Sequence, residues 1–372
     1  MENTTHSAGK LCILGIQHVF AMFGATVLVP LLTGLDTSVA LFCAGVGTII
    51  FHLFTGRKVP VFLGSSFAFI GAIQVTASMM SGGAAIGTAE YMVGLRYACG
   101  GIIVAGGLYV VLALLVMVFG AEKIRSFFPP VVTGPVIIII GMMLAPTAIN
   151  SIILKDGVAL MGSALWVNWA IAAITIGTMF VVSIYMKGFF KMVPILFGIA
   201  VGYLAAVIFN ACGFPVVDFT PVAEAPWVSA PKFFLPLFDW RAIALIAPIA
   251  IVTFVEHIGD ISANSAVVGK DFFQDPGLHR TLLGDGVATM FAGCIGGPAN
   301  TTYSENTGVL AATRNYNPLT LEIAAVFAIC LSFFSKFGGF LSTLPGAIMG
   351  GISIILFGMI SAVGLRTLVE NQ

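Results

Sequence analysis

Two glutamates in the C-terminal half of the chain are the side chains best placed to do chemistry. Glu305 lies in the stretch GGPANTTYSENTGVLAATR, residues 296–314, which gathers hydroxyl and amide side chains between two apolar runs. Glu256 lies in the apolar run VTFVEHIGD. The chain is 59% hydrophobic and 9% charged, with a mean hydropathy of +1.06, which indicates a membrane protein. Because a carboxylate at bilayer depth costs at least about 2.5 kcal/mol, we expect both glutamates to serve a function.

A matching polar interruption occurs in the first half, at VPVFLGSSFAFIGA, residues 59–72. Two spans before each interruption comes a polar pair, Gln17-His18 in the first half and Glu256-His257 in the second. Such paired interruptions are the best sequence pointer to a transporter site between inverted repeats. The alternative is that small and hydroxyl residues at 64–66 serve close helix packing. That alternative does not account for the two glutamates.

The expected site combines main-chain groups with carboxylates. Short extended segments at the two interruptions would leave backbone N–H and C=O groups unpaired, and each would adjoin the positive end of a half-helix. We expect the amides near Phe67 and Ser304 to donate hydrogen bonds, and Glu256 and Glu305 to accept them. A flat ligand with N–H and C=O groups on its edges fits this set. Aromatic walls are expected from Phe67, Tyr303 and Phe357.

Glu256 is the expected proton carrier because apolar surroundings disfavour an ionised carboxyl group. Asp260 follows four residues later on the same helix face and is expected to share the proton-coupling role, as is His18. Alternatives stay open: Asp260 as a solvated residue at the helix exit, His18 and His257 as packing histidines, and Tyr303 as a packing anchor. No role is assigned to Glu322.

Apolar runs of roughly 20 residues recur along the chain, and each is long enough to span a bilayer. The predicted fold class is an all-α polytopic membrane protein without a soluble domain. The six cysteines are far apart and form no CxxC or His/Cys cluster, so neither a disulfide framework nor a metal site is indicated. About twelve spans are expected, at residues 11–32, 37–55, 60–79, 93–119, 127–149, 164–186, 192–212, 241–262, 281–296, 299–313, 318–338 and 343–367.

Charge sets the expected orientation and narrows the function classes. Eleven of the sixteen Lys and Arg residues fall in segments on the side of the N-terminus, which predicts that both termini are cytoplasmic. No Ser/His/Asp set, metal spacing or phosphate loop points to a membrane enzyme. A channel-like or anion-exchanging protein of the same architecture would place basic residues near the half-helix ends, where this chain instead has Glu305.

Several stretches together resemble the nucleobase–ascorbate transporter family, most closely its bacterial uracil permeases, from about Leu11 to the end. The family's hallmark corresponds here to Glu305-Asn306-Thr307-Gly308 followed by Thr313 and Arg314. Glutamate at its first position resembles the uracil branch, whereas the purine branch usually carries glutamine. The stretches are QHVFAMFGATVLVP, FLGSSFAFI, VEHIGD, DPGLHRTLLGDGVAT and GGPANTTYSENTGVLAATR.

The resemblance implies a fourteen-span inverted repeat of seven-span halves, divided into a core and a gate domain, with short extended segments in spans 3 and 10. About 12 of the 14 spans are then present, and the last two are absent. The implied division is core at 1–119 (spans 1–4), gate at 120–240 (spans 5–7 and a long outer loop), core at 241–340 (spans 8–11) and gate at 341–372 (span 12).

The implied function is proton-coupled uptake of uracil across the cytoplasmic membrane by alternating access, with the proton as coupling ion and no cofactor. Glu256 and Glu305 would bind the edge of the base. The main chain at Phe67 and Ser304 would donate hydrogen bonds, and Ala25 and Tyr303 would line the pocket.

This chain departs from the uracil permeases at two site positions. They carry histidine where Asp260 stands and tyrosine where Phe357 stands. Three alternatives stay open: a xanthine or broader nucleobase carrier, a truncated non-transporting remnant that keeps the binding core, and a homodimer that supplies the missing surface.

Overall fold

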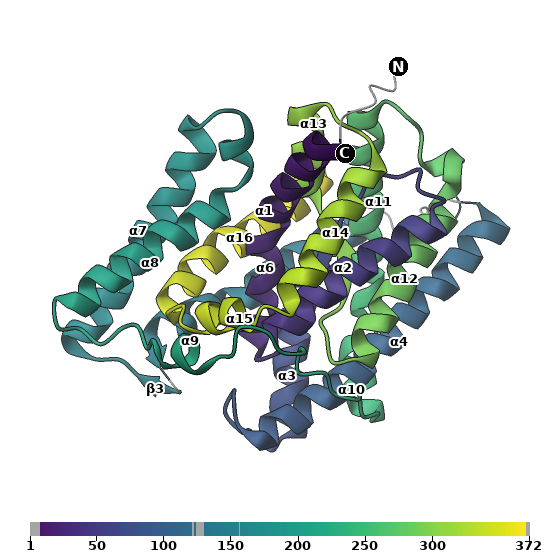
Figure 1. The fold of residues 1–372 in the computed structure, drawn as a ribbon. Coiled ribbons are helices and arrows are strands. Elements are labelled where there is room, and N and C mark those ends of the chain that lie inside the picture. The colour runs from purple at the N-terminus through teal and green to yellow at the C-terminus, as the bar shows by residue number, and fades with distance from the viewer. Residues whose placement is uncertain (1–7, 121–122, 124–129, 156, 370–372) are drawn as a thin grey trace.

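The computed structural model describes residues 8–120, 123, 130–155 and 157–369, and most of this part of the chain is helical (Figure 1). Eight of its helices are long and apolar enough to cross a membrane, or nine if the pair Pro318–Ser332 and Ser335–Ser342, bent by 78°, forms one span. The prediction of a polytopic helical membrane protein is confirmed, but the count of twelve spans is not. The expected start of one span, at 127–129, lies outside the described residues.

The N-terminal part of the fold is a helix pair, a break and a second helix pair. Asp36 begins the second helix by accepting hydrogen bonds from the amides of Ser38 and Val39. The break holds a three-residue strand before a half-helix. The elements are α1 (Ala8–Thr33), α2 (Thr37–Phe54), β1 (Leu63–Ser65), η1 (Phe67–Phe69), α3 (Ile70–Met80) and α4 (Ala89–Phe119).

The same order returns in the C-terminal half. Again a strand of three residues follows two helices, and again a short helix starts two residues after the strand ends. The elements are α10 (Trp240–Ile246), α11 (Ile249–Val268), η3 (Phe273–Gly277), α12 (Leu278–Cys294), β4 (Asn300–Thr302), α13 (Ser304–Thr313), α14 (Pro318–Ser332) and α15 (Ser335–Ser342). The two strands pair antiparallel, so the two repeats run in opposite directions where they meet.

The remaining elements lie mainly between the repeats in sequence, with α16 after the second repeat. They are α6 (Pro130–Ile153), β2 (Leu154–Lys155), β3 (Val158–Ala159), α7 (Gly162–Tyr185), η2 (Gly188–Met192), α8 (Pro194–Ala211), α9 (Thr220–Glu224) and α16 (Gly346–Val369). Helix α16 packs along α6 and α7, and α7 packs along α8. Helices α2, α4, α12 and α14 form a separate packed group, on the right of Figure 1.

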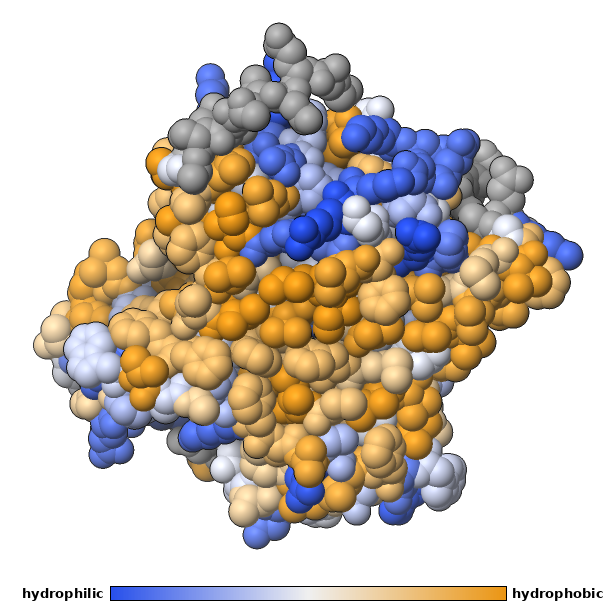
Figure 2. Space-filling view, turned by 45° about the vertical axis from the view of Figure 1, so that its right-hand side comes forward, coloured by the Kyte–Doolittle hydropathy of each residue, from blue (hydrophilic) through white to orange (hydrophobic). Residues whose placement is uncertain are grey.

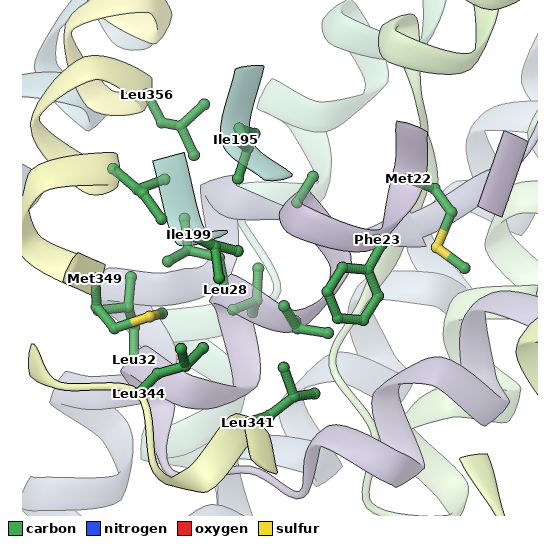
Figure 3. Packing of buried hydrophobic residues seen from close by; sticks show 14 of the residues in the cluster. Met22, Phe23, Leu28, Leu32, Ile195, Ile199, Leu341, Leu344, Met349 and Leu356 are labelled. Carbon is green, nitrogen blue, oxygen red and sulfur yellow. The ribbon is translucent and has the colours of Figure 1, made fainter. Parts of the chain in front are cut away.

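Helix α1 lies between these two groups and carries much of the packing that joins them. Figure 3 shows Leu28 and Leu32 of α1 facing Ile199 of α8 and Met349 of α16. On the face shown in Figure 2, the surface is apolar in a broad central belt, with polar residues above and below it. This surface suits a molecule whose middle is solvated by lipid, where backbone groups must pair inside helices.

Close helix contact depends on glycine, as between α4 and α12. A Cβ placed on Gly106 would lie 2.7 Å from the carbonyl oxygen of Gly286, and one on Gly286 would lie 2.9 Å from that of Gly106. The neighbouring Gly107 has no heavy atom within 4 Å of the same position. These two adjacent glycines therefore separate the effect of packing from the effect of helix propensity.

We predict that Gly106→Ala lowers the free energy of unfolding by about 1–3 kcal/mol, because the methyl group forces α4 and α12 apart. Gly107→Ala is the matched control and should leave stability unchanged or slightly raised, since alanine favours helix over glycine. Thermal unfolding of the two purified variants measures the difference. Equal melting temperatures would show that the α4–α12 contact is not tight.

Candidate functional site

The site is built around the pairing of β1 with β4, which lies at the breaks in the two repeats. Leu63 pairs with Thr302 and Ser65 with Asn300. The pairing continues on both sides, since the Tyr303 amide donates to the Phe62 carbonyl at 3.0 Å and the Ser66 amide to the Ala299 carbonyl at 2.9 Å. All six strand residues are buried. The extended segments predicted from the two interruptions thus satisfy each other's main chain.

Hydroxyl side chains from equivalent helices hold the outer edges of the two strands. The Thr48 hydroxyl of α2 accepts a hydrogen bond from the Leu63 amide at 2.9 Å and lies 3.4 Å from the Leu63 carbonyl oxygen. The Thr289 hydroxyl of α12 donates to the carbonyl of Asn300 at 3.1 Å. These backbone groups at membrane depth are therefore paired with protein groups and do not need water as a partner.

Two half-helices start directly beyond the strands. Within the described residues, neither the N-cap of η1 (Ser66) nor that of α13 (Tyr303) makes a side-chain cap hydrogen bond; η1 begins at Phe67 and α13 at Ser304. The Ser304 residue is exposed and Phe67 is half-buried, although the strands beside them are fully buried. Open, uncapped helix N-termini present N–H donors and a positive dipole end. The structure therefore places two sets of donors at the crossing.

Four carboxyl groups gather on the second-repeat side of the crossing. Glu256 and Asp260 of α11, Asp285 of α12 and Glu305 of α13 are close enough for their charges to interact. Glu256 is exposed, although its neighbours on the helix, Phe254 and His257, are fully buried. Its side chain is therefore accessible, unlike those of its neighbours on the helix. Glu256 and Glu305 thus lie on one side of the protein.

Glu305 also borders a cavity of about 180 Å³. The cavity is lined by α1, α7, α8 and α16, with mostly apolar side chains. Lys191 and Ser183 are the other residues in its wall with polar side chains. A ligand in this space would therefore lie between α1 and Glu305 on one side and the α7–α8–α16 group on the other.

Asp260 faces strand β4. Its Oδ2 atom accepts a hydrogen bond from the Thr302 hydroxyl at 2.5 Å, and the residue is half-buried. It is therefore bonded inside the protein rather than solvated at the end of α11. Its predicted part in proton coupling is not tested by this contact.

The two histidines that follow polar residues near the middle of their helices are both buried and bonded. His257 Nδ1 lies 3.0 Å from Asp285 Oδ2, and its Nε2 lies 2.9 Å from the Thr281 hydroxyl. His18 Nδ1 lies 3.1 Å from Asn306 Nδ2, which also donates to the carbonyl of His18. Both rings join neighbouring helices, as the packing alternative expects. The proton-coupling role of His18 stays a prediction.

Tyr303 closes the crossing from one side. Its hydroxyl donates to the carbonyl of Ser65 at 3.0 Å, and the Thr26 hydroxyl lies 3.4 Å from it. Its ring lies over Gly64, where a Cβ would come within 2.3 Å of the ring. Tyr303, Ala25 and Phe357 are all buried in the same hydrophobic cluster. In this conformation Tyr303 is an anchor of the packing, and the predicted pocket-lining role of the three residues stays a prediction.

Sequence reasoning gave no role to three polar residues at this site. Asn264 donates from Nδ2 to the carbonyl of Pro60 at 2.9 Å and lies 3.3 Å from the Thr307 hydroxyl, Thr302 holds Asp260, and Asp285 holds His257. A signal for Asn264 was present, because positions 256, 260 and 264 share one helix face at intervals of four. The other two could be found only from the contact between distant helices.

Two broken helices that meet inside a polytopic helical protein are the arrangement found at the substrate site of many inverted-repeat transporters. The Permease family matches residues 9–372, and the chain belongs to this family. It is therefore a multi-pass membrane permease rather than an enzyme.

Similar proteins are also described as permeases. A probable uracil permease of Pasteurella multocida is 46% identical, covering 98% of this chain and 82% of the relative. A uracil permease of Bacillus subtilis is 41% identical, covering 96% and 79%. A putative pyrimidine permease of Escherichia coli is 39% identical, covering 98% and 78%.

Solved structures share the fold at low sequence identity. The transmembrane domain of a cyanobacterium bicarbonate transporter superposes with a TM-score of 0.72 at 14% identity, covering 98% of this chain and 97% of that one. A murine Solute Carrier 26 anion transporter in the inward-facing state superposes with a TM-score of 0.71 at 12% identity, covering 99% and 62%. At these identities the likeness concerns the fold alone.

We predict that Gly64→Ala lowers the free energy of unfolding by about 1–3 kcal/mol, because the added methyl group displaces the ring of Tyr303. Gly71→Ala in the following half-helix is the control, since its nearest neighbour is the flexible end of Leu144 at 3.2 Å. Thermal unfolding of both variants and of Gly64→Ala/Tyr303→Ala measures the effect. Loss of the ring should remove most of the penalty caused by the methyl group. A penalty that persists without the ring would contradict this contact.

Proposed function

We propose that this permease carries uracil across the cytoplasmic membrane by alternating access, coupled to protons. The observation that carries the proposal is the meeting of Glu256 and Glu305 with two uncapped half-helix ends at one crossing. The printed descriptions of relatives at 35–46% identity support uracil as the substrate. Both termini are proposed to be cytoplasmic, on the distribution of lysine and arginine.

The binding chemistry follows from the edges of the base. Uracil offers N–H donors and C=O acceptors in one plane, which match carboxylate acceptors and main-chain donors. In the proposed arrangement, Glu256 and Glu305 accept from the N–H groups, and the amides at Phe67 and Ser304 donate to the C=O groups. Glutamate rather than an amide at residue 305 favours a substrate that presents a donor there. Because glutamate at this position resembles the uracil branch of the family, it supports uracil rather than a purine as the substrate.

The proposed proton pathway uses the carboxyl groups themselves. When several carboxyl groups lie close together in surroundings of low polarity, electrostatic repulsion between their charges prevents all of them from being ionised at once. Glu256 is the proposed carrier because it is accessible and interacts with both Asp285 and Glu305. Asp260 is proposed as its partner through the shared helix face.

Alternating access requires the crossing to move against the α7–α8–α16 group. The two parts touch closely at glycines: a Cβ on Gly24 of α1 would lie 2.4 Å from Ile195, and one on Gly308 of α13 would lie 3.0 Å from Met192. The cavity beside Glu305 lies along the same boundary. Movement of one group past the other would therefore open or close the route to Glu305 without breaking the strand pair.

We predict that Glu305→Gln raises the Kd for uracil by about tenfold or more, because the neutral amide oxygen is a weaker acceptor than the carboxylate and the charge-assisted hydrogen bond is lost. Radiolabelled uracil binding to purified protein measures this. Glu90→Gln, at an exposed position at the start of α4, is the control and should bind as the wild type does. Unchanged affinity in a folded Glu305→Gln protein would remove Glu305 from the site.

We further predict that Glu256→Gln abolishes stimulation of uracil uptake by an imposed pH gradient, because glutamine cannot carry a proton. The measurement is labelled-uracil uptake into proteoliposomes with and without the gradient, beside wild type and Glu90→Gln. Counterflow exchange of uracil without a gradient separates loss of coupling from loss of binding. Full gradient stimulation in Glu256→Gln would assign the proton to another group.

A further inference from the structure

The segment that leads into β1 runs back along the helix it has just left. Helix α2 ends at Phe54, and the chain turns through Gly56 and Arg57, which both have positive φ. The Arg57 amide donates to the carbonyl of His52 at 2.7 Å, which closes the turn against the last helical turn. Residues 59–63 therefore lie beside the face of α2 that carries His52.

Two side chains of α2 bond the returning segment at every second residue. His52 Nε2 lies 2.9 Å from the carbonyl oxygen of Val61, and the Thr48 hydroxyl bonds the amide of Leu63. Four residues of helix rise about 6 Å, and two residues of extended chain span about 6.6 Å. The spacing of His52 and Thr48 on the helix therefore matches the spacing of Val61 and Leu63 on the returning segment.

The His52 ring is connected to the protein surface through Glu322 and Arg57. Its Nδ1 lies 3.3 Å from Glu322 Oε1 of α14, and Arg57 Nε donates to the same oxygen at 2.9 Å. The side chains are 66% exposed for Arg57, 14% for Glu322 and 1% for His52. The chain of contacts thus runs from an exposed guanidinium through a nearly buried carboxylate to a buried ring that contacts the strand segment.

The contacts of His52 are chemically exacting. The carbonyl of Val61 can only accept a hydrogen bond, and an ionised carboxylate at Glu322 can also only accept one. Both contacts are hydrogen bonds at once only when the ring carries two protons or the carboxyl group carries one. Removing either partner would leave a buried polar group unpaired, which costs more than the bond itself contributes.

We propose that His52, held by Glu322, is a positioning residue for the substrate site. It fixes the register of residues 61–65, and hence the position of the main-chain donor at Phe67, two residues beyond β1. It does not touch the base. The inference rests on the proposed function insofar as the amide at Phe67 is assigned there to the base.

The first test measures the strand without any ligand. Asparagine at residue 52 is too short to reach the Val61 carbonyl, whereas glutamine can place an amide N–H near the position of Nε2. Hydrogen exchange at the Leu63 and Ser66 amides of the full chain should therefore be about tenfold faster in His52→Asn than in wild type, and near wild type in His52→Gln. Equal exchange in all three proteins would overturn the proposal.

The second test measures uracil affinity on the same proteins. We expect His52→Asn to raise the Kd about tenfold, Glu322→Gln to raise it about threefold, and His52→Gln to stay within about twofold of wild type. Asp275→Asn is the matched control, because its ion pair with Lys58 adjoins the same segment but joins side chains that are 51% and 72% exposed. Exposed pairs contribute little, so its Kd should not change.

The outcomes separate the two proposals. Wild-type protein that binds no uracil would contradict the proposed function, while the exchange rates would still decide whether His52 sets the register of β1. Uracil binding by wild type with an unchanged Kd in folded His52→Asn would overturn the positioning role alone. Equal losses in His52→Asn and His52→Gln would also overturn it, because rescue by the longer amide is what positioning requires.

Discussion

The structure depends on one constraint: backbone groups inside a membrane must be paired, and this chain interrupts two helices there. The solution is to pair the two interruptions with each other, β1 with β4, and to bond their outer edges by hydroxyl groups of α2 and α12. Each repeat supplies what the other lacks. Neither break could exist alone in lipid, so the site and the two-repeat architecture are one feature.

Pairing the strands has a second consequence for the half-helices that follow. Because β1 and β4 are antiparallel and each precedes a short helix by two residues, both helix N-termini start at the crossing. Their uncapped amides are donors fixed by secondary structure, which reorganise little when a ligand arrives. The flexible part of recognition is left to side chains, chiefly the carboxylates on α11 and α13.

Much of this could be predicted from the sequence. The interruptions at 59–72 and 296–314 combine small and hydroxyl residues in matched places. They could be recognised because hydropathy and motif spacing depend only on residues that are near each other in the sequence. The prediction that they are extended is confirmed by β1 and β4. The total of twelve spans was less secure, since three of them became helices of 11, 17 and 10 residues, shorter than the eight long spans.

Contacts between distant helices were beyond the sequence. Nothing in one chain pairs Asp285 with His257, or Thr302 with Asp260, until the helices pack. Glu322 had no assigned role because its partner, His52, lies 270 residues earlier in the chain. The contact also depends on the turn that brings Val61 back to the His52 ring. The position of Tyr303 also depends on a distant contact. An aromatic residue beside a polar motif suggests a pocket wall, but the ring is buried because Gly64 has no side chain and leaves room for it.

The repeats are alike in backbone and unlike in charge, and this difference bears on function. Counting from the strands, Glu305 corresponds to Ala68, and Glu256 corresponds to Gln17 in the polar pairs. The symmetric backbone therefore offers donors from both halves, while the carboxyl groups beside the crossing come from the second half alone. A ligand with different edges needs such asymmetry to bind in one orientation. Confining the carboxylates to one side also brings them close enough to compete for a proton, which a symmetric arrangement across the crossing would weaken.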